Sequence, residues 1–247
     1  MAGLSSRFAK AGFNQPKYML PLAGRPMLDW SILSFAGDLG TEPMLFVYRD
    51  IDGTAEFVRE RAGACGVRRP VFVQLGAPTS GQAETVALGL AGAGASDSTA
   101  LTIFNIDTLR PGLRSPVLDG AAGLLEVVRA EGEHWSFVDP DPARPGLARR
   151  VTEKERISDL CCTGLYAFRS AGEFRRALGE AGPTAGELYV APLYNAIIAE
   201  GGAVRYTLTG ADAVFFAGTP EEYAQARADE GAIARAFEAA REGATKW

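Results

Sequence analysis

The chain has 247 residues, of which 47% are hydrophobic and 22% are charged, and its formal net charge is -5 at pH 7. This composition is typical of a globular protein that buries a sizeable core. The acidic balance excludes a broad basic surface for nucleic acid, and no apolar run approaches the length of a membrane span. We therefore expect neither nucleic acid nor a membrane as a partner.

The amino-terminal segment has the residues of an anion-binding loop. Gly3 to Ser6 are small or flexible, Arg7 follows directly, and Lys17 stands in a Pro-Lys pair. Glycine and serine at a loop tip let consecutive backbone N–H groups converge on an anion. Arg7 adds a forked donor that is always charged, and Lys17 adds a compact point charge. Together these residues favour the binding of a polyphosphate.

A strand is missing from its usual place before this loop. In phosphate-binding α/β folds the loop follows a buried strand, but only Met1 and Ala2 precede Gly3. We therefore expect the true amino terminus to lie upstream.

The first half of the chain predicts alternating strands and helices. Apolar runs at 44–48, 71–75 and 99–106 are typical of strands buried on both faces of a parallel sheet. Helices are expected over 51–65, over 82–93, and from Pro26 onward, the last with an apolar face of Leu28, Ile32, Phe35 and Leu39. This order predicts an α/β fold with a doubly wound, Rossmann-like core.

The second half predicts mixed or antiparallel strands at 134–138, 148–153 and 159–168. A helix over 190–200, short strands at 204–208 and 214–216, and a helix from Pro220 that buries Tyr223, Ile233 and Phe237 should follow. No linker is visible, so we expect a single domain over 1–247. Its nucleotide-binding half would cover about 1–110 and its acceptor-binding half about 111–247.

Asp107 follows the third predicted strand. A carboxylate at the carboxyl end of a parallel strand faces the crevice where α/β proteins bind ligands. Such a carboxylate can hold Mg²⁺, with phosphate oxygens and water completing the shell. The alternative is an aspartate that only closes a turn.

The three cysteines, Cys65, Cys161 and Cys162, show no zinc-binding spacing. We expect them to be buried, reduced thiols of a cytoplasmic protein. The only histidine, His134, is expected to pack at a strand end rather than to act in catalysis.

The segment from Gly3 to Lys17 resembles the G-x-G-x-R and P-K signature of the sugar-phosphate nucleotidyltransferases, with Ser5 at the place of the second glycine. The strings NID, HWSFV, EKERISDL and GLYAF are most similar to family members from the synthesis of bacterial capsules and surface polysaccharides. The resemblance implies a nucleotide-diphospho-sugar transferase type of fold with a mostly parallel or mixed sheet. It also implies that a nucleoside triphosphate (NTP) reacts with a sugar 1-phosphate or a similar phosphorylated acceptor, releasing pyrophosphate.

The resemblance implies site residues on the nucleotide side. It implies catalytic roles for Arg7, Lys17 and Asp107, and it implies that Asp107 binds Mg²⁺. In the family a second metal-binding aspartate precedes a Gly-Thr-Pro-like turn. Here residues 214–217, directly before that turn, are apolar. The nearest candidate, Asp212, stands a few residues away from the expected position. Nucleotide contacts are implied for Ala2, Gly3, Leu4, Ser5, Ser6, Gly81 and Gln82.

On the acceptor side, the resemblance implies contacts from Lys154, Gly164 and Glu187. The structural alternatives are a surface ion pair for Lys154, a strand bulge for Gly164 and a helix-terminal acid for Glu187. For Gly81 and Gln82 the alternative is a helix capping box that begins at Thr79.

Three other functions stay open at this point: a CTP-dependent cytidylyltransferase that uses a non-sugar phosphate, a glycosyltransferase that consumes a nucleotide sugar, and a non-catalytic nucleotide- or sugar-binding module. Assembly into a homo-oligomer is also left open.

Overall fold

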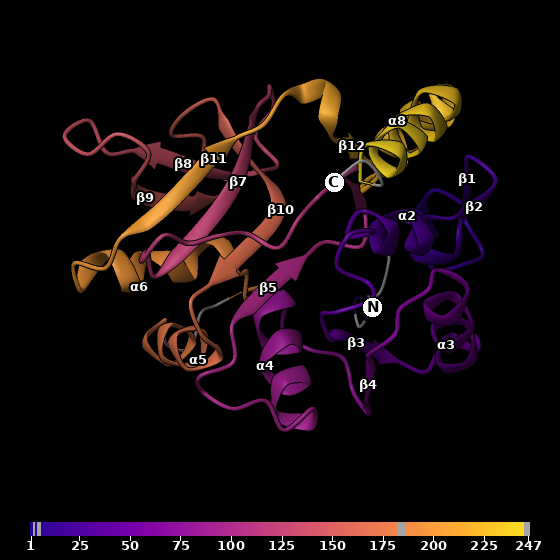
Figure 1. Cartoon of the computed structure of the whole chain (residues 1–247), viewed down its shortest axis with the longest axis horizontal. Coiled ribbons are helices and arrows are strands. Elements are labelled where there is room, and N and C mark those ends of the chain that lie inside the picture. Colours follow the sequence, from indigo (N-terminus) through magenta and orange to yellow (C-terminus); the bar gives the residue numbers. More distant parts are fainter. Residues whose placement is uncertain (2, 4–5, 182–185, 245–247) are drawn as a thin grey trace. The chain divides into compact units, whose positions relative to one another are not determined.

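The computed structural model describes residues 1, 3, 6–181 and 186–244, except for the side chains of 243 and 244 (Figure 1). Two compact units form, and each combines segments that are distant in sequence. Unit 1 comprises Met1–Pro78, Asn105–Ser115 and Asp212–Trp247, and unit 2 comprises Thr79–Phe104 and Pro116–Ala211. Within the described residues, no helix has the length and apolar character needed to cross a membrane.

Unit 1 contains three small pairs of strands. Strand β3 (Met44–Arg49) runs parallel to β4 (Pro70–Leu75), β1 (Pro21–Leu22) runs antiparallel to β2 (Arg25–Pro26), and β6 (Thr108–Leu109) runs antiparallel to β12 (Phe215–Phe216). The helices of unit 1 are α1 (Ser6–Lys10), η1 (Lys17–Met19), α2 (Met27–Leu33), α3 (Thr54–Ala64), α7 (Pro220–Ala228) and α8 (Glu230–Ala244).

Unit 2 is built on a six-stranded sheet with the order β11-β7-β10-β8-β9, in which β5 also pairs with β10. Only the β11–β7 pair is parallel, and Figure 1 shows these two strands side by side. The strands are β5 (Leu101–Phe104), β7 (Gly123–Arg129), β8 (Ser136–Pro140), β9 (Ala148–Glu153), β10 (Leu160–Phe168) and β11 (Val204–Leu208). The helices are α4 (Gln82–Gly92), α5 (Ala171–Glu180), η2 (Ala191–Leu193) and α6 (Tyr194–Ala199). A short helix, η3 (Ala211–Ala213), follows β11.

The expected strands and helices are present, with differences in extent and pairing. Helix α2 ends at Leu33, so Phe35 and Leu39, which we expected on its apolar face, lie beyond it, although both are buried. Strand β5 is shorter than predicted and pairs antiparallel with β10, whereas we expected a parallel neighbour. Strand β10 pairs with other strands along both of its edges, with β7 on one edge and β8 and β5 on the other. Every residue of β10 is buried. The predicted helix from Pro220 is two helices, because α7 ends before Asp229. The mixed α/β class is as expected.

Among the elements longer than five residues, the sequence analysis missed two; the shorter α1, η1, η3, β1, β2 and β6 were not predicted either. Strand β7 lies between β11 and β10 and is buried along most of its length. Helix α5 begins after Ser170, whose hydroxyl accepts a hydrogen bond from the Glu173 N–H at 3.1 Å, and it packs Phe174 against Phe168. Its signal was a serine N-cap before an amphipathic stretch.

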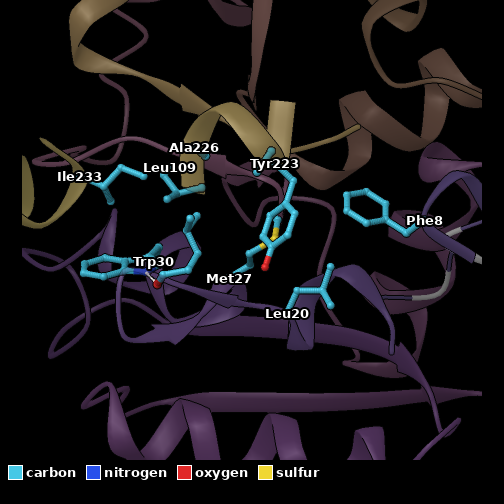
Figure 2. Packing of buried hydrophobic residues seen from close by; sticks show 10 residues of the cluster. Phe8, Leu20, Met27, Trp30, Leu109, Tyr223, Ala226 and Ile233 are labelled. Carbon is cyan, nitrogen blue, oxygen red and sulfur yellow. Dashed lines mark hydrogen bonds between the residues drawn. The ribbon is translucent and has the colours of Figure 1, made fainter. Parts of the chain in front are cut away.

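The core of unit 1 joins residues from both ends of the chain (Figure 2). Phe8 of α1 lies edge-on to the ring of Tyr223 of α7, with the ring centres 6.0 Å apart. The Tyr223 hydroxyl donates to the Pro21 carbonyl at 2.6 Å, so burying this ring leaves no polar group unpaired. Burial of these side chains holds the amino-terminal segment against α7 and α8. The full cluster consists of Phe8, Leu20, Leu22, Met27, Trp30, Leu109, Ala217, Tyr223, Ala226 and Ile233.

A buried ion pair joins α2 to α3. The Asp29 carboxylate is fully buried and accepts hydrogen bonds from Arg61 Nε at 2.7 Å and Nη2 at 2.5 Å. This two-pronged contact uses both carboxylate oxygens. Without Asp29, Arg61 would keep the Glu60 carboxylate at 3.3 Å, but its Nε and Nη2 donors would lose their partner.

Replacement of Asp29 by alanine should therefore destabilise the protein. We expect Asp29→Ala to lower the free energy of unfolding by about 1–3 kcal/mol, measured by urea denaturation. Glu155→Ala, which removes an exposed partner of Arg150, is the control and should cost less than about 1 kcal/mol. Equal losses in the two variants would contradict this account of Asp29.

Candidate functional site

Met1 lies beside the edge of β3. The Met1 amino group donates to the Val47 carbonyl at 2.8 Å, and the Met1 carbonyl accepts from the Arg49 N–H at 3.5 Å. These are the contacts of a parallel strand. Burial, with help from the Lys17 charge, lowers the pKa of the Met1 amino group to about 5, while the Asp107 charge acts in the opposite direction. Lys17 and Asp107 are thus close enough to Met1 to act on it electrostatically.

The predicted loop is only partly described. Gly3 is exposed, and Ser6 is exposed at the start of α1. Three predicted nucleotide contacts, Ala2, Leu4 and Ser5, lie outside the described residues.

Lys17 and Asp107 form an ion pair. The Lys17 ammonium donates to Asp107 Oδ2, and the side chains are 23% and 17% exposed. Lys17 starts the 3-10 helix η1 directly after Pro16, and Asp107 directly precedes β6. Two predicted catalytic groups that are distant in sequence are therefore brought together within unit 1.

The turn after β12 holds Asp107 in place. The Ala217 N–H donates to the Asp107 carbonyl at 2.9 Å, and Phe216 pairs with Thr108 in the β6–β12 ladder. At Gly218, an added Cβ would lie 2.9 Å from Asp107 Oδ2 and 3.3 Å from Glu222 Oε2. A Cβ here would force the Asp107 carboxylate to shift, because both carboxylates approach the Gly218 Cα closely.

Glu222 is a carboxylate of this region that the sequence analysis missed. Its Oε2 accepts from the N–H groups of Gly218 at 2.8 Å and Thr219 at 3.0 Å, and Thr219 completes a capping box at the start of α7. The Thr-x-x-Glu spacing was the available signal. By contrast, Asp212 is exposed in η3, before β12.

Arg7 is exposed on α1. Its charge acts on Glu221: a backbone hydrogen bond and the Thr219 hydroxyl are the main causes that lower the pKa of Glu221, and the Arg7 guanidinium adds to them. Arg7 therefore lies within electrostatic range of the first turn of α7.

The oxygen donors around Asp107 fit a hard cation. Carboxylate oxygens are the ligands that Mg²⁺ prefers, and it usually takes only one or two of them from the protein. Across residues 1, 3, 6–181 and 186–244, no group of three or more His, Cys, Asp or Glu side chains is arranged to hold a metal. The chemistry suits a metal bound by Asp107 together with phosphate oxygens, rather than a closed protein cage.

The turn before α4 packs against the segment that contains Glu187. A Cβ at Gly81 would clash with the backbone of Leu188, and Leu188 hydrogen-bonds to Ser80 at 2.9 Å and Ala83 at 3.0 Å. Gly81 is the N-cap of α4 and Gln82 its first residue, with no side-chain cap, so the capping box from Thr79 is not formed. Gly81 thus has a structural reason of its own to be glycine.

Lys154 and Glu187 meet through Tyr189. The Lys154 ammonium donates to the Tyr189 hydroxyl and lies 4.5 Å from the ring centre, and this hydroxyl donates to Glu187 Oε2 at 2.5 Å. The Tyr189 hydrogen bond is the main cause that raises the pKa of Lys154. Glu187 lies outside any helix, so the helix-terminal alternative is wrong. Tyr189 was not predicted from the sequence.

Two backbone features accompany these acceptor candidates. Lys154 has a φ of +56°, and its N–H donates to the Trp135 carbonyl at 2.8 Å. A lysine in this left-handed conformation is uncommon and is held by its surroundings. Gly164, with a φ of +97°, lies where the β10–β7 register shifts between Cys162 and Tyr166, so the bulge alternative describes its backbone correctly.

All three cysteines are buried and free, as expected. His134 stacks obliquely on Trp135, with ring centres 4.5 Å apart.

Known proteins share this architecture. The solved nucleoside-diphosphate-sugar pyrophosphorylase from Vibrio cholerae RC9 is 41% identical, with a TM-score of 0.87 over 92% of this chain and 98% of that chain. The inositol-1-phosphate CTP transferase from T. maritima, 15% identical with a TM-score of 0.76, covers 96% of this chain and 93% of that chain and shows a common fold only.

Among curated proteins, the bifunctional enzyme IspD/IspF of Hyphomonas neptunium is 30% identical over 193 residues, which are 72% of this chain. The chain spans only 43% of the length of that enzyme. No family model matches the chain.

Fold and relatives together define an enzyme of the nucleotidyltransferase class. The chain belongs to the sugar-phosphate nucleotidyltransferase family. The family, the fold type and the class of enzyme implied by the amino-terminal motif are thereby confirmed.

The close approach at Gly218 predicts that even a methyl group is costly there. We expect Gly218→Ala to lower the free energy of unfolding by about 1–3 kcal/mol, because the methyl group would push Asp107 and Glu222 away. Gly40→Ala, at an exposed turn with open space around the Cα, is the control. Urea denaturation of both variants measures the difference. Unchanged stability of Gly218→Ala would show that the turn has room.

The environment of Glu153 predicts a pH effect. Burial raises the pKa of this carboxyl above its ordinary value of 4.5, against the opposing effects of the Ser136 hydroxyl and Lys154. Its contribution to stability is complete below 4.5 and is lost as the pH rises through the raised pKa. Glu153→Gln stays neutral, so its stability relative to the wild type should be greater at about pH 7 than at about pH 4.

Urea denaturation at the two pH values checks this prediction, with Glu155→Gln as an exposed control. A relative stability of Glu153→Gln that does not depend on pH would contradict it.

Proposed function

We propose that this enzyme joins an NTP to a sugar 1-phosphate or a similar phosphorylated acceptor and releases pyrophosphate. The observation that carries the proposal is the pairing of Lys17 with Asp107 beside the amino-terminal segment, in a chain 41% identical to a nucleoside-diphosphate-sugar pyrophosphorylase. A cation and a carboxylate at this place are the groups needed to hold a triphosphate and its counter-ion.

On the nucleotide side, the proposal assigns phosphate contacts to Arg7, Lys17 and the loop from Ala2 to Ser6. Gly81 and Gln82 are assigned to the base. Lys17 can exchange its contact with Asp107 for a phosphate oxygen, because its flexible stem carries three donors.

Mg²⁺ is the proposed cofactor, held by Asp107 together with phosphate oxygens. When bound, it would neutralise charge on the triphosphate. Asp212 is a weak candidate for a second ligand. Glu222 already accepts hydrogen bonds from Gly218 and Thr219 and serves to position the turn beside Asp107.

The chemical step is an in-line displacement. An oxygen of the acceptor phosphate forms a bond to the α-phosphorus of the NTP, and the bond from that phosphorus to the bridging oxygen breaks. The electron pair leaves with pyrophosphate. No proton must be removed from the attacking phosphate because it is already ionised, so positioning and charge neutralisation are the main tasks of the protein. Arg7 and Lys17 would offset the charge that develops on the departing pyrophosphate.

On the acceptor side, Lys154 is assigned to the acceptor phosphate, Glu187 to sugar hydroxyls and the Gly164 backbone to the sugar. The Tyr189 hydroxyl supports this assignment because it contacts both Lys154 and Glu187. Use of the product in capsule or surface polysaccharide synthesis, and a cytoplasmic location, belong to the same proposal.

A pyrophosphate-release screen tests the proposal. Four or five NTPs, CTP among them, are combined with Mg²⁺ and a panel of sugar 1-phosphates and non-sugar phosphates. Pyrophosphate release with a sugar 1-phosphate supports the proposal, and release only with CTP and a non-sugar phosphate supports the cytidylyltransferase alternative. NTP binding without release in any combination would favour a non-catalytic module. Consumption of a nucleotide sugar would favour a glycosyltransferase.

With the best substrates, Lys17→Ala should lower kcat at least ~100-fold, because a positioned charge lowers the barrier by about 3 kcal/mol. Lys10→Ala removes an exposed lysine of α1 and serves as the matched control. Steady-state kinetics and a thermal unfolding curve are measured for each variant. A near-normal rate in Lys17→Ala would remove this residue from the mechanism.

A further inference from the structure

Arg49 is a half-buried residue with one unusual donor atom. Its Nη1 atom is buried and, within the part of the chain that the structure describes, has no hydrogen-bond partner. A guanidinium stays charged at any pH that a protein experiences. A buried donor without a partner is costly, and more so when it is charged. An oxygen acceptor from outside the chain would satisfy this donor.

The position of Arg49 points to the nature of that partner. Arg49 is the last residue of β3, which runs parallel to β4. Ligands of α/β proteins bind beyond the carboxyl ends of parallel strands. The Arg49 N–H donates to the Met1 carbonyl, and Met1 lies within the electrostatic range of Lys17 and Asp107. Arg49 therefore belongs to the same end of unit 1 as the predicted phosphate-binding groups.

Neighbouring carboxylates do not supply the missing partner. Asp50 Oδ1 accepts from the Ala55 N–H at 3.0 Å, near the start of α3. Asp107 is paired with Lys17. Within residues 1, 3, 6–181 and 186–244, Arg49 forms no ion pair with any carboxylate of the protein.

We propose that Arg49 is a phosphate-binding residue whose Nη1 donates to an oxygen of the NTP triphosphate. This inference rests on the proposed function and adds a third cation to Arg7 and Lys17. A forked guanidinium suits phosphate oxygens, which accept two parallel hydrogen bonds. A bound phosphate oxygen would also satisfy the buried donor and so relieve its energetic cost.

Arg49→Met tests the inference, because methionine is apolar and of similar reach. Inorganic tripolyphosphate and the preferred NTP are the probes, and calorimetry measures their Kd. We expect Arg49→Met to weaken both affinities at least ~10-fold, the effect of losing a hydrogen bond to a charged group. The Tm of the free variant should equal or exceed that of the wild type, because an unsatisfied buried donor is gone.

Arg68→Met, at an exposed arginine before β4, is the matched control and should leave Kd and Tm unchanged. Arg49→Lys keeps the charge but not the fork, and should bind tripolyphosphate with an affinity between those of the wild type and Arg49→Met. If Arg49→Met does not fold, a weaker affinity of Arg49→Lys for tripolyphosphate supports the inference and an unchanged affinity overturns it.

A folded Arg49→Met with a lower Tm and unchanged affinities would show that Arg49 is structural, and would leave the proposed function intact. Wild-type protein that binds tripolyphosphate but releases no pyrophosphate in the screen would reject the proposed function alone. A wild type that binds neither probe would overturn both.

Discussion

The structure of unit 1 depends on burying Tyr223 against the amino-terminal segment. Phe8, Leu20 and Met27 come from the first part of the chain, and Tyr223 and Ile233 come from its last helices. Because these side chains share one cluster (Figure 2), the turn at Gly218 is held beside Asp107 and thus beside Lys17. The hydrophobic effect therefore assembles groups whose charges alone would not hold them together.

Charges in this protein are placed in two different ways. Both oxygens of the buried Asp29 carboxylate accept hydrogen bonds from Arg61, and this contact contributes to stability. Lys17, Asp107 and Arg49 lie near the segment that precedes the predicted loop, and there a donor remains buried without a partner. Groups that are already oriented bind a highly charged ligand more tightly, because less free energy is lost in ordering them when the ligand binds.

Local patterns in the sequence were sufficient for most elements. Strands β9 and β11 begin and end where their apolar patterns predict, and α4 differs by a single residue at its end. The pairing of strands is a different matter, because it depends on residues far away in the chain. β5 pairs antiparallel because the fully buried β10 offers an edge to it, and β7 was overlooked although it lies next to β10 in the sheet. No local pattern carries this information.

The sequence by itself determined the family, since the small residues, Arg7 and Lys17 at their spacing are a local chemical signature. It also predicted roles in binding or catalysis for Lys154, Glu187 and Asp107, and these roles remain predictions. Only the tertiary structure decided which groups meet: Lys17 with Asp107, Lys154 with Glu187 through Tyr189, and Glu222 with the turn at Gly218. Spacing along a chain records what a residue can do, whereas its partners depend on how distant apolar surfaces are buried together.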